Sequence, residues 1–398
     1  MVLHDDNAKY IKKEILEMLS EGGFDRLGEA VQILLNATML AEREKYLGAG
    51  PYERTETRTG QANGFKPKTM RTRVGEIPLA VPQTRDGKFY PNCLEKGQRS
   101  EKALTLAIAE MYVQGVSTRK VMSITQELCG FDVSSSSVSR ATAELDTLFI
   151  AWRDRTLDCF PYVYLDARYE KVREGGVVID QAVLVAVGVS ESGKREVLGV
   201  SVELSEAEVH WRKFLQTLQQ RGLHGVKLFI SDDHAGLKAA RKAVFPAVPW
   251  QRCQYHLQQN AQKYVPREDM KAQVAVDIRN IFNAPDGEEA NRLLKRTVVS
   301  YEKTAPKLSQ WMAESLPEGL TVFALPAKHR TRTRTTNGVE RLNKEIKRRT
   351  RVVSIFPNSA SCLRLVTAVL METSEDWQTD NSYLTFDQSE KLIAKRMN

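Results

Sequence analysis

The most constraining feature of this sequence is the order of its apolar runs between residues 160 and 253. Three runs rich in β-branched residues follow one another with short, glycine-containing links, which favours an antiparallel meander. Helix-like and strand-like segments then alternate. The region therefore predicts a mixed α/β sheet. In chain order the segments are strands at 162–172, 177–189 and 194–204, a helix at 206–220, a strand at 226–231, a helix at 236–244 and a short strand at 248–253.

Helical segments follow this β-rich region. Residues 258–326 have helical periodicity and equal numbers of acids and bases, and further helices are expected at 335–353 and 363–377. Three antiparallel strands followed by alternating helix and strand is the element order of a ribonuclease H-like core. We therefore predict an α/β ribonuclease H-like catalytic core that is interrupted by an all-helical insertion.

Three modules are predicted before this core. Residues 5–48 are helical with a break at Gly22-Gly23, and their wide apolar faces fit core packing and dimerisation equally well. Residues 50–98 alternate in short runs between Gly and Pro, as in a small β segment or extended arm. Residues 100–147 resemble a three-helix unit of the helix-turn-helix type. The predicted domains are 1–49, 50–99, 100–150, 151–257, 258–326 and 327–398.

Two of these modules carry candidate DNA contacts. The β segment begins with basic residues that suit an arm following DNA phosphates, although a plain surface hairpin gives the same pattern. The third helix of residues 100–147 presents short polar groups and an arginine, as recognition helices do, although many three-helix units never meet DNA. The candidates are Lys66, Lys68, Arg71 and Arg73 in the arm, and Ser136, Ser137 and Arg140 on the helix.

The positive charge of the chain is concentrated in one segment. The 398 residues carry a net charge of +8, and the ten basic and two acidic residues between Lys328 and Arg351 account for that whole surplus. Such a concentration indicates a polyanion, most simply nucleic acid, with a solvated helix face as the alternative. The candidates for DNA binding there are Arg341, Lys344, Lys347, Arg348, Arg349 and Arg351.

Composition excludes several classes of protein. Hydrophobic residues make up 42% and charged residues 27% of the chain, which excludes wholesale disorder. Apolar runs are too short for a membrane span, and the N-terminus lacks the apolar region of a secretory signal. The five cysteines are odd in number and widely spaced. We therefore expect a reduced, cytoplasmic, nucleoid-associated protein without membrane contact.

Three carboxylates are placed where chemistry is expected. Asp166 lies inside the first core strand, Asp232 follows a buried strand at its carboxyl end, and Glu340 begins a helix within the basic segment. An acid in an apolar strand is costly unless it is paired or binds a metal. Three converging acids can hold two divalent cations, which suits in-line attack on a phosphate, and oxygen ligands favour Mg²⁺ or Mn²⁺.

The helical periodicity around Glu340 predicts which side of its helix packs on the core. At 100° per residue, Val339, Leu342 and Ile346 form a narrow apolar stripe, and Glu340 and Lys347 lie together beside it. A metal ligand would then lie next to a cation that can hold the attacked strand. The alternative is a surface ion pair between Glu340 and the lysine four residues on.

Several blocks of the sequence resemble the Mutator-type transposases of bacterial insertion sequences, which are DDE transposases. The final block is highly specific, and the resemblance covers almost the whole chain. The blocks are NGFKPKTMRTRVGEIPLAVPQTRDGKFYP at 63–91, DARYEKVRE at 166–174, SDDHAGLKAA at 231–240, WQRCQYH at 250–256 and NGVERLNKEIKRRTRVVSIFPN at 337–358.

This resemblance implies a catalytic triad of Asp166, Asp232 and Glu340, which also bind the metal, and it matches Lys347 to the basic position of the family. Two residues depart from the family pattern. Gln83 replaces a common arginine, and Asp233 makes a double aspartate where the family usually has one. Position at the strand end and alignment of the motif both favour Asp232.

Cys253 and His256 form a C-x-x-H pair. A structural zinc site needs four ligands, and no second pair of Cys or His lies at a usable spacing. The resemblance instead implies a motif near the active site that serves core architecture or DNA contact.

The predicted function is a DNA transposase that binds terminal inverted repeats and uses Mg²⁺, with Mn²⁺ as a substitute, to cut and join strands. The family resemblance implies a copy-out and paste-in route. The expected partners are element-end DNA, target DNA and a second copy of the chain, because two ends must be held together. The alternatives are a ribonuclease H-fold nuclease that cuts without joining, and a DNA-binding regulator with an unused catalytic fold.

Overall fold

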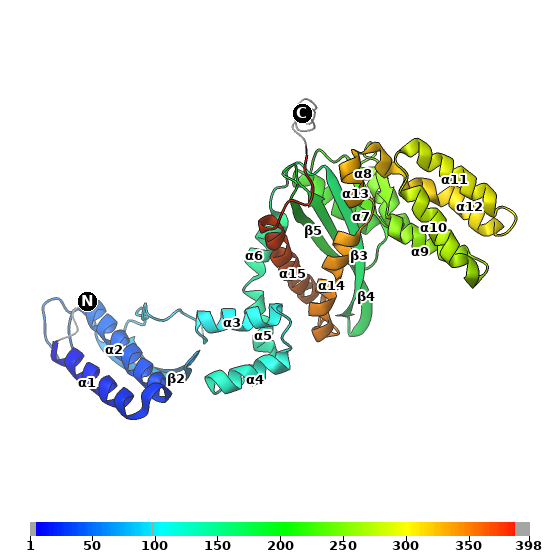
Figure 1. Ribbon diagram of the computed structural model, residues 1–398. Coiled ribbons are helices and arrows are strands. Elements are labelled where there is room, and N and C mark those ends of the chain that lie inside the picture. The colour runs from blue at the N-terminus through cyan, green and yellow to red at the C-terminus, as the bar shows by residue number, and fades with distance from the viewer. Residues whose placement is uncertain (1–4, 98, 387–398) are drawn as a thin grey trace. The chain divides into compact units, whose positions relative to one another are not determined.

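The structure is a computed structural model, and it describes residues 5–97 and 99–386 (Figure 1). The chain divides into two compact units, residues 1–145 and residues 146–398, and each is described by itself. The first and last predicted domains reach past this range, since residues 1–4 and 387–398 lie outside the described residues.

The first unit begins with a helical pair and a hairpin. Helix α1 (Asp5–Gly22), the 3₁₀ turn η1 (Gly23–Arg26) and helix α2 (Leu27–Leu47) precede strands β1 (Ala62–Thr72) and β2 (Gly75–Thr84). The strands pair antiparallel, and α2 packs on β2. The predicted helices and small β segment are therefore confirmed. Their shared core contains Met39, Ile77, Leu79, Val81 and Leu94.

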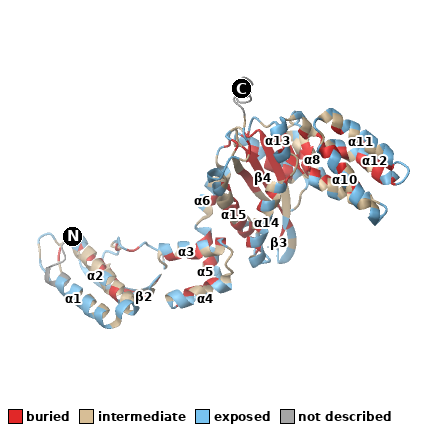
Figure 2. Ribbon diagram, in the orientation of Figure 1, coloured by how far each residue is buried: buried red, intermediate tan, exposed pale blue. Residues whose placement is uncertain are grey.

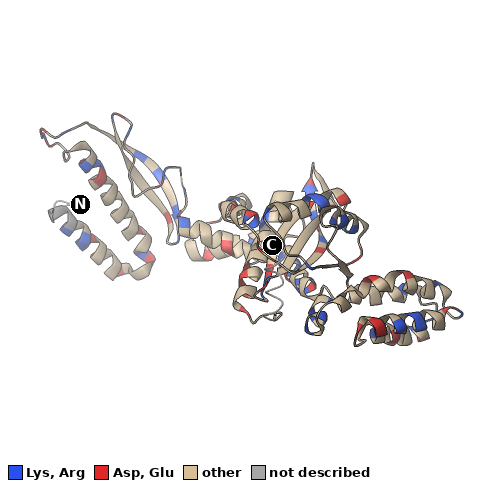
Figure 3. Cartoon of the chain, turned by 90° about the horizontal axis from the view of Figure 1, so that it is seen from above, with Lys and Arg blue, Asp and Glu red and all other residues tan. Residues whose placement is uncertain are grey.

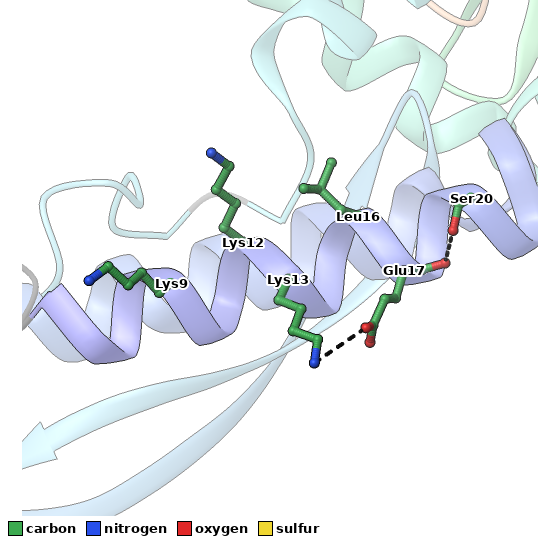
Figure 4. A pocket seen from close by; sticks show the side chains of 6 residues that line it. All are labelled: Lys9, Lys12, Lys13, Leu16, Glu17 and Ser20. Carbon is green, nitrogen blue, oxygen red and sulfur yellow. Dashed lines mark hydrogen bonds and ion pairs between the residues drawn. The ribbon is translucent and has the colours of Figure 1, made fainter.

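Helix α1 presents a mixed outer face. Leu16 is 57% exposed, and Lys9, Lys12, Lys13 and Glu17 lie around it on the same helix (Figure 4). Lys13 and Glu17 form an exposed ion pair at 3.7 Å. Of the apolar positions predicted on this helix, Leu16 lies on this exposed face, whereas Ile11, Ile15 and Leu19 lie on another side and are partly buried.

Three helices complete the first unit, namely α3 (Lys102–Val113), α4 (Thr118–Cys129) and α5 (Ser135–Ala143). The Ser117 side chain accepts a hydrogen bond from a backbone N–H in the first turn of α4. Gly130, at φ +71°, ends that helix in the left-handed conformation that favours glycine. The predicted three-helix arrangement is present. Its core contains Leu104, Ile108, Ala109, Val121, Phe131, Val133, Val138 and Ala141.

The second unit is built on a five-stranded sheet in the order β5-β4-β3-β6-β7. β3, β4 and β5 form the predicted antiparallel meander, and β6 and β7 are added in parallel beside β3. The last two strands are shorter than predicted, because only a few of their residues pair. The strands are β3 (Tyr162–Glu174), β4 (Val177–Val189), β5 (Arg195–Glu203), β6 (Leu228–Ser231) and β7 (Trp250–Arg252).

Helices cover both faces of this sheet (Figures 1 and 2). α7 (Glu208–Gln220) and α8 (Ala235–Val244) pack on one face, while α14 (Asn337–Val353) and α15 (Ser359–Thr379) pack on the other. Burial on both faces explains why the run from residue 182 to 189 is apolar throughout instead of alternating. Within the described residues, none of the helices combines the length and apolar character needed to cross a membrane.

A helical segment lies between β7 and α14 and has its own core, which includes Ile278, Leu294, Leu308 and Met312. Its elements are α9 (Gln254–Ala261), η2 (Gln262–Tyr264), η3 (Glu268–Met270), α10 (Lys271–Phe282), α11 (Gly287–Tyr301), α12 (Pro306–Ser315), η4 (Leu316–Gly319), η5 (Thr321–Ala324) and α13 (Ala327–Thr333). The buried Gln251 side chain joins this segment to β7: its amide donates to the Gly319 carbonyl at 2.8 Å and accepts from the Val322 N–H at 2.7 Å.

The boundary between the two units differs from the predicted one at residue 150. Helix α6 (Asp146–Asp154) packs on α15. The Arg364 guanidinium donates two hydrogen bonds of 2.6 Å to the Asp146 carboxylate. Arg153 also donates to the Thr367 hydroxyl at 3.1 Å. These tertiary contacts place residues 146–150 in the second unit.

We predict that Gln251→Leu lowers the free energy of unfolding by about 1–3 kcal/mol, because the Val322 N–H loses its partner inside the protein. Gln259→Leu is the matched control, since Gln259 is exposed on α9 and bonds only to a neighbouring side chain. Urea unfolding measures both variants. Equal stability of the two variants would contradict this account of how the helical segment is held.

Candidate active site

The sheet places two of the predicted carboxylates side by side. In the parallel pairing of β3 and β6, Tyr164 lies opposite Ile230. Asp166 follows two residues later within β3, and Asp232 is the first residue after the end of β6, so the same register continued places the two acids opposite each other. Both lie toward the carboxyl end of β6, the edge at which open sheets collect ligands.

Helix α14 brings the third carboxylate to the same place. Val339, Leu342 and Ile346 are buried, as the apolar stripe predicted. This packing turns Asn343 toward β3, where its amide donates a hydrogen bond of 2.7 Å to Asp166 Oδ2. Asp166 Oδ1 accepts from the backbone N–H of the next residue at 3.0 Å. Asn343 was not predicted as a site residue, because its contact is with a residue 177 positions away.

The electrostatics of this cluster are those of a cation site. Burial, and then the negative charge of Asp232, raise the pKa of Asp166 to about 7, and Glu340 acts in the same direction. Glu340 Oε1 is buried without a hydrogen bond. Three acids whose charges act on one another, one of them with a raised pKa, fit a divalent cation as their shared partner. The residues present therefore suit Mg²⁺ or Mn²⁺.

Asp233, the other member of the double aspartate, is used differently. Its carboxylate forms ion pairs with Arg252 at 3.0 Å and with Lys238 at 3.2 Å. Glu318 pairs with the same two cations at 2.9 and 2.8 Å. Asp233 thus belongs to a four-residue ionic network that connects α8, β7 and η4, whereas the charge of Asp232 acts on Asp166.

Glu206 is a fourth acid near the site that sequence reasoning did not identify. Burial raises the pKa of its carboxyl group, His234 lowers it, and the charge of Asp232 raises it further. Glu206 Oε2 lies 3.9 Å from His234 Nδ1. The residue sits in the link between β5 and α7, where no spacing or apolar pattern distinguishes it from a surface acid.

The structure places the C-x-x-H pair beside Glu340. Cys253 Sγ accepts from the backbone N–H and the hydroxyl of Thr336, each at 3.4 Å, and His256 Nε2 lies 3.8 Å from Glu340 Oε1. Burial would raise the pKa of the Cys253 thiol, but its contacts with His256 and Thr336 outweigh burial and lower it. The contact with Cys253 is the main cause that raises the pKa of His256 to about 9.

The predicted basic residues of α14 divide into two groups. Arg348 is exposed but pairs with Glu345 at 2.6 Å. Arg349 is instead buried and forms ion pairs with Glu345 at 3.0 Å and Glu372 at 3.2 Å. Its guanidinium is therefore committed to the contact between α14 and α15, and we remove it from the DNA-facing set. The other exposed residues are Arg341, Lys344, Lys347 and Arg351.

In the first unit, basic residues follow the β1–β2 hairpin (Figure 3). Lys66 is exposed, and Lys68 donates to the Tyr90 hydroxyl at 3.0 Å. Arg71 pairs with an acid on β2 at 3.0 Å, and Arg73 pairs with Glu101 at 2.9 Å. All four cations are thus present on the hairpin, three of them with a partner within the unit.

A hollow in the first unit connects this hairpin with α5. Ser136 and Arg140 are exposed, and Arg140 donates to the Ser137 hydroxyl at 3.1 Å. The hollow therefore brings together predicted residues from both modules. Its polar and charged lining includes Arg71, Arg99, Lys102, Ser137, Arg140 and Glu144.

Comparison with known proteins gives a consistent result. Residues 6–380 match the family model described as "Transposase, Mutator family". The chain is 58% identical over 371 residues to the transposase for insertion sequence element IS406 of Burkholderia multivorans, covering 93% of this chain and 96% of the relative. It is 45% identical to the ISRM5 transposase of Rhizobium meliloti, covering 94% of each chain. It is 39% identical to the IS256 transposase in transposon Tn4001 of Staphylococcus aureus, covering 89% and 92%.

The two aspartates of the doublet should respond oppositely to neutralisation. Without metal, Asp232→Asn should raise the melting temperature, because it removes repulsion with Asp166, and it should abolish stabilisation by added Mg²⁺. Asp233→Asn should lower the melting temperature, because Arg252 and Lys238 lose an anion, and should keep the response to Mg²⁺. Thermal unfolding with and without Mg²⁺ measures both. The reverse pattern would assign the site to Asp233.

Proposed function

This chain belongs to the Mutator family of transposases, and we propose that it cuts and joins DNA strands at a site formed by Asp166, Asp232 and Glu340. Its relatives are transposases of insertion sequences, so the chain is a transposase of a mobile element. The observation that carries the proposal is that three carboxylates lie near one edge of the sheet. The pKa of Asp166 is raised there, and Glu340 Oε1 is buried without a hydrogen bond.

The metal is Mg²⁺ in this proposal, with Mn²⁺ as a substitute, and its oxygen ligands are the three carboxylates. When bound, the cations supply Lewis acidity that activates the attacking oxygen and stabilises the leaving oxygen of a phosphodiester. The same three side chains serve strand cleavage by water and the later attack by the freed 3′-OH, with no covalent protein intermediate.

Asn343 contributes by orienting Asp166. Its amide bond fixes one carboxylate oxygen, and the backbone N–H of the next residue holds the other. The Arg168 guanidinium donates to the Asn343 backbone carbonyl, which ties this part of α14 to β3. Asp166 is thus oriented by contacts between strand and helix before DNA arrives, which lowers the reorganisation that this residue needs during the reaction.

The DNA strand under attack runs along the exposed face of α14 in this proposal. Lys344, Lys347 and Arg351 have no ion pair recorded among the described residues, so their charges are available for phosphates. Lys347 lies two turns from Glu340 on the same line of the helix. The end sequence is read separately by the first unit, through the hairpin cations and α5.

The finer assignments complete the proposal. The sheet of the second unit is a ribonuclease H-like core, the helical segment from α9 to η5 is its insertion, and α3 to α5 are a helix-turn-helix. The protein acts on chromosomal DNA in the cytoplasm, by copying out and pasting in. A two-fold dimer holds the two ends, with residues 5–48 as the candidate interface.

Replacing any one of Asp166, Asp232 or Glu340 by its amide should lower the rates of cleavage and joining by about 100-fold or more, because the charge that holds Mg²⁺ is lost. Binding to element ends should survive, because the amide keeps the shape of the side chain. Labelled element-end DNA, scored separately for nicked and joined products, measures both steps. An active Glu340→Gln protein would remove Glu340 from the site. Nicking without joining in the wild type would favour the nuclease alternative.

Lys347→Ala should reduce the cleavage rate of bound DNA more than it reduces affinity, because other cations share the bulk of the phosphate attraction. The slope of log affinity against log salt should fall by about one unit. Arg292→Ala is the control, since Arg292 is an exposed helical arginine in the helical segment and pairs with Glu289 at 2.6 Å. If binding fell more than cleavage, Lys347 would not contact the DNA strand at the point of attack.

A further inference from the structure

We propose that Cys253, His256 and Glu340 form a second metal site, selective for a zinc-class cation, and that its occupation inhibits the protein. The C-x-x-H pair alone offers two ligands, which is too few for a zinc site. The structure adds a third ligand from α14, a helix far downstream in the chain. Binding at this site is independent of the proposed DNA chemistry, and only the inhibitory consequence rests on it.

The three side chains are arranged as a partly formed coordination shell. Their ligand atoms all lie within 4.8 Å of one another, and the His256 Nε2 to Glu340 Oε1 distance is 3.8 Å. Ligand atoms around a tetrahedral zinc lie about 3.4–3.7 Å apart, as follows from its bond lengths. Small side-chain rotations therefore close the shell.

The local structure holds the Cys253 sulfur in place, whereas the Glu340 carboxylate is free to rotate. Cys253 is fully buried at the start of α9, and its backbone N–H donates to the Ser231 carbonyl at 2.7 Å. Glu340 Oε1 has no hydrogen bond to lose. The side chains of His256 and Glu340 are each about one-third exposed, at 31% and 30%, so a cation has an approach from solvent.

The ligand chemistry selects the metal. A thiolate and an imidazole favour Zn²⁺ over Mg²⁺, which prefers oxygen ligands in an octahedral shell. Three protein ligands leave one position for water, as in open zinc sites. Binding displaces the thiol proton to solvent, and no oxidation or reduction takes part.

Glu340 is shared between the two sites, and this sharing gives the inhibition. A carboxylate oxygen turned toward Cys253 and His256 is withdrawn from Asp166 and Asp232. In the proposed function, that withdrawal leaves the magnesium site with two acids instead of three. Zn²⁺ would therefore act as an antagonist through a residue that both sites need.

Co²⁺ titration of the full-length protein tests binding without any DNA reaction. The wild type and the control Cys93→Ser, which changes an exposed cysteine in the first unit, should both give a sulfur-to-cobalt charge-transfer band that saturates at one equivalent. Cys253→Ser should lose the band. His256→Gln should weaken binding by about tenfold or more, and it serves if the cysteine variant does not fold. A band that persists in Cys253→Ser, or none in the wild type, would overturn the site.

Inhibition is tested by adding Zn²⁺ to element-end cleavage at fixed Mg²⁺. Each variant is compared with its own rate without zinc, so a lower starting rate does not matter. The zinc concentration for half-inhibition should be about tenfold or more higher for His256→Gln than for the wild type and Cys93→Ser. Equal inhibition of all three would mean that zinc simply replaces magnesium, and would overturn the antagonism. Absence of cleavage in every protein would instead contradict the proposed function and leave the Co²⁺ result standing.

Discussion

The main physical constraint on the second unit is that it must hold several acidic side chains close together at one edge of its sheet. Asp166 lies within β3, Asp232 immediately follows the adjacent parallel strand β6, and α14 adds Glu340. Burial, and then the negative charge of Asp232, raises the pKa of Asp166 to about 7, so the charged forms of these acids disfavour one another. The apolar contacts of α14 with the sheet, together with the hydrogen bonds of Asn343 to Asp166 and of Arg168 to the Asn343 carbonyl, hold the acids in place against this repulsion. Because a bound cation would relieve this repulsion, cation binding should stabilise the folded protein.

The cations near this cluster have different partners. Arg252 and Lys238 pair with Asp233 and Glu318, whereas the charge of His256 acts on Asp166 and lowers its pKa. Asn343 orients Asp166 without adding charge. The acids of the ionic network, Asp233 and Glu318, thus stabilise the link between the sheet and the helical segment and leave Asp166, Asp232 and Glu340 as candidate ligands of a divalent cation.

The sequence predicted the parts of the site that local pattern controls. Asp166 and Asp232 could be found because each stands out against an apolar strand, and the facing of Glu340 follows from helical periodicity. Asn343, Glu206 and the role of Asp233 could not be found, since each depends on tertiary contacts between distant segments. Arg349 shows the same limit. Its place in a basic run suggested that it binds DNA. Its partner Glu372 lies on another helix, α15, so the ion pair could not be seen in the local sequence.

The fold shows a similar division. The strands of the meander and the helical character of the N-terminal and C-terminal segments followed from periodicity, whereas the end of the first unit did not. That boundary depends on the Arg364–Asp146 ion pair, which no local pattern encodes. The third ligand of the Cys253 and His256 pair was missed for the same reason, because helix α14 supplies it from another part of the chain.

The central claim is that Asp166, Asp232 and Glu340 bind one cluster of divalent cations. Anomalous scattering from Mn²⁺, in crystals of the protein with element-end DNA, tests it most directly. The account predicts manganese peaks within bonding distance of all three carboxylates and next to the cleaved phosphate. Manganese bound by Asp233, or a site that Glu340 does not touch, would contradict it.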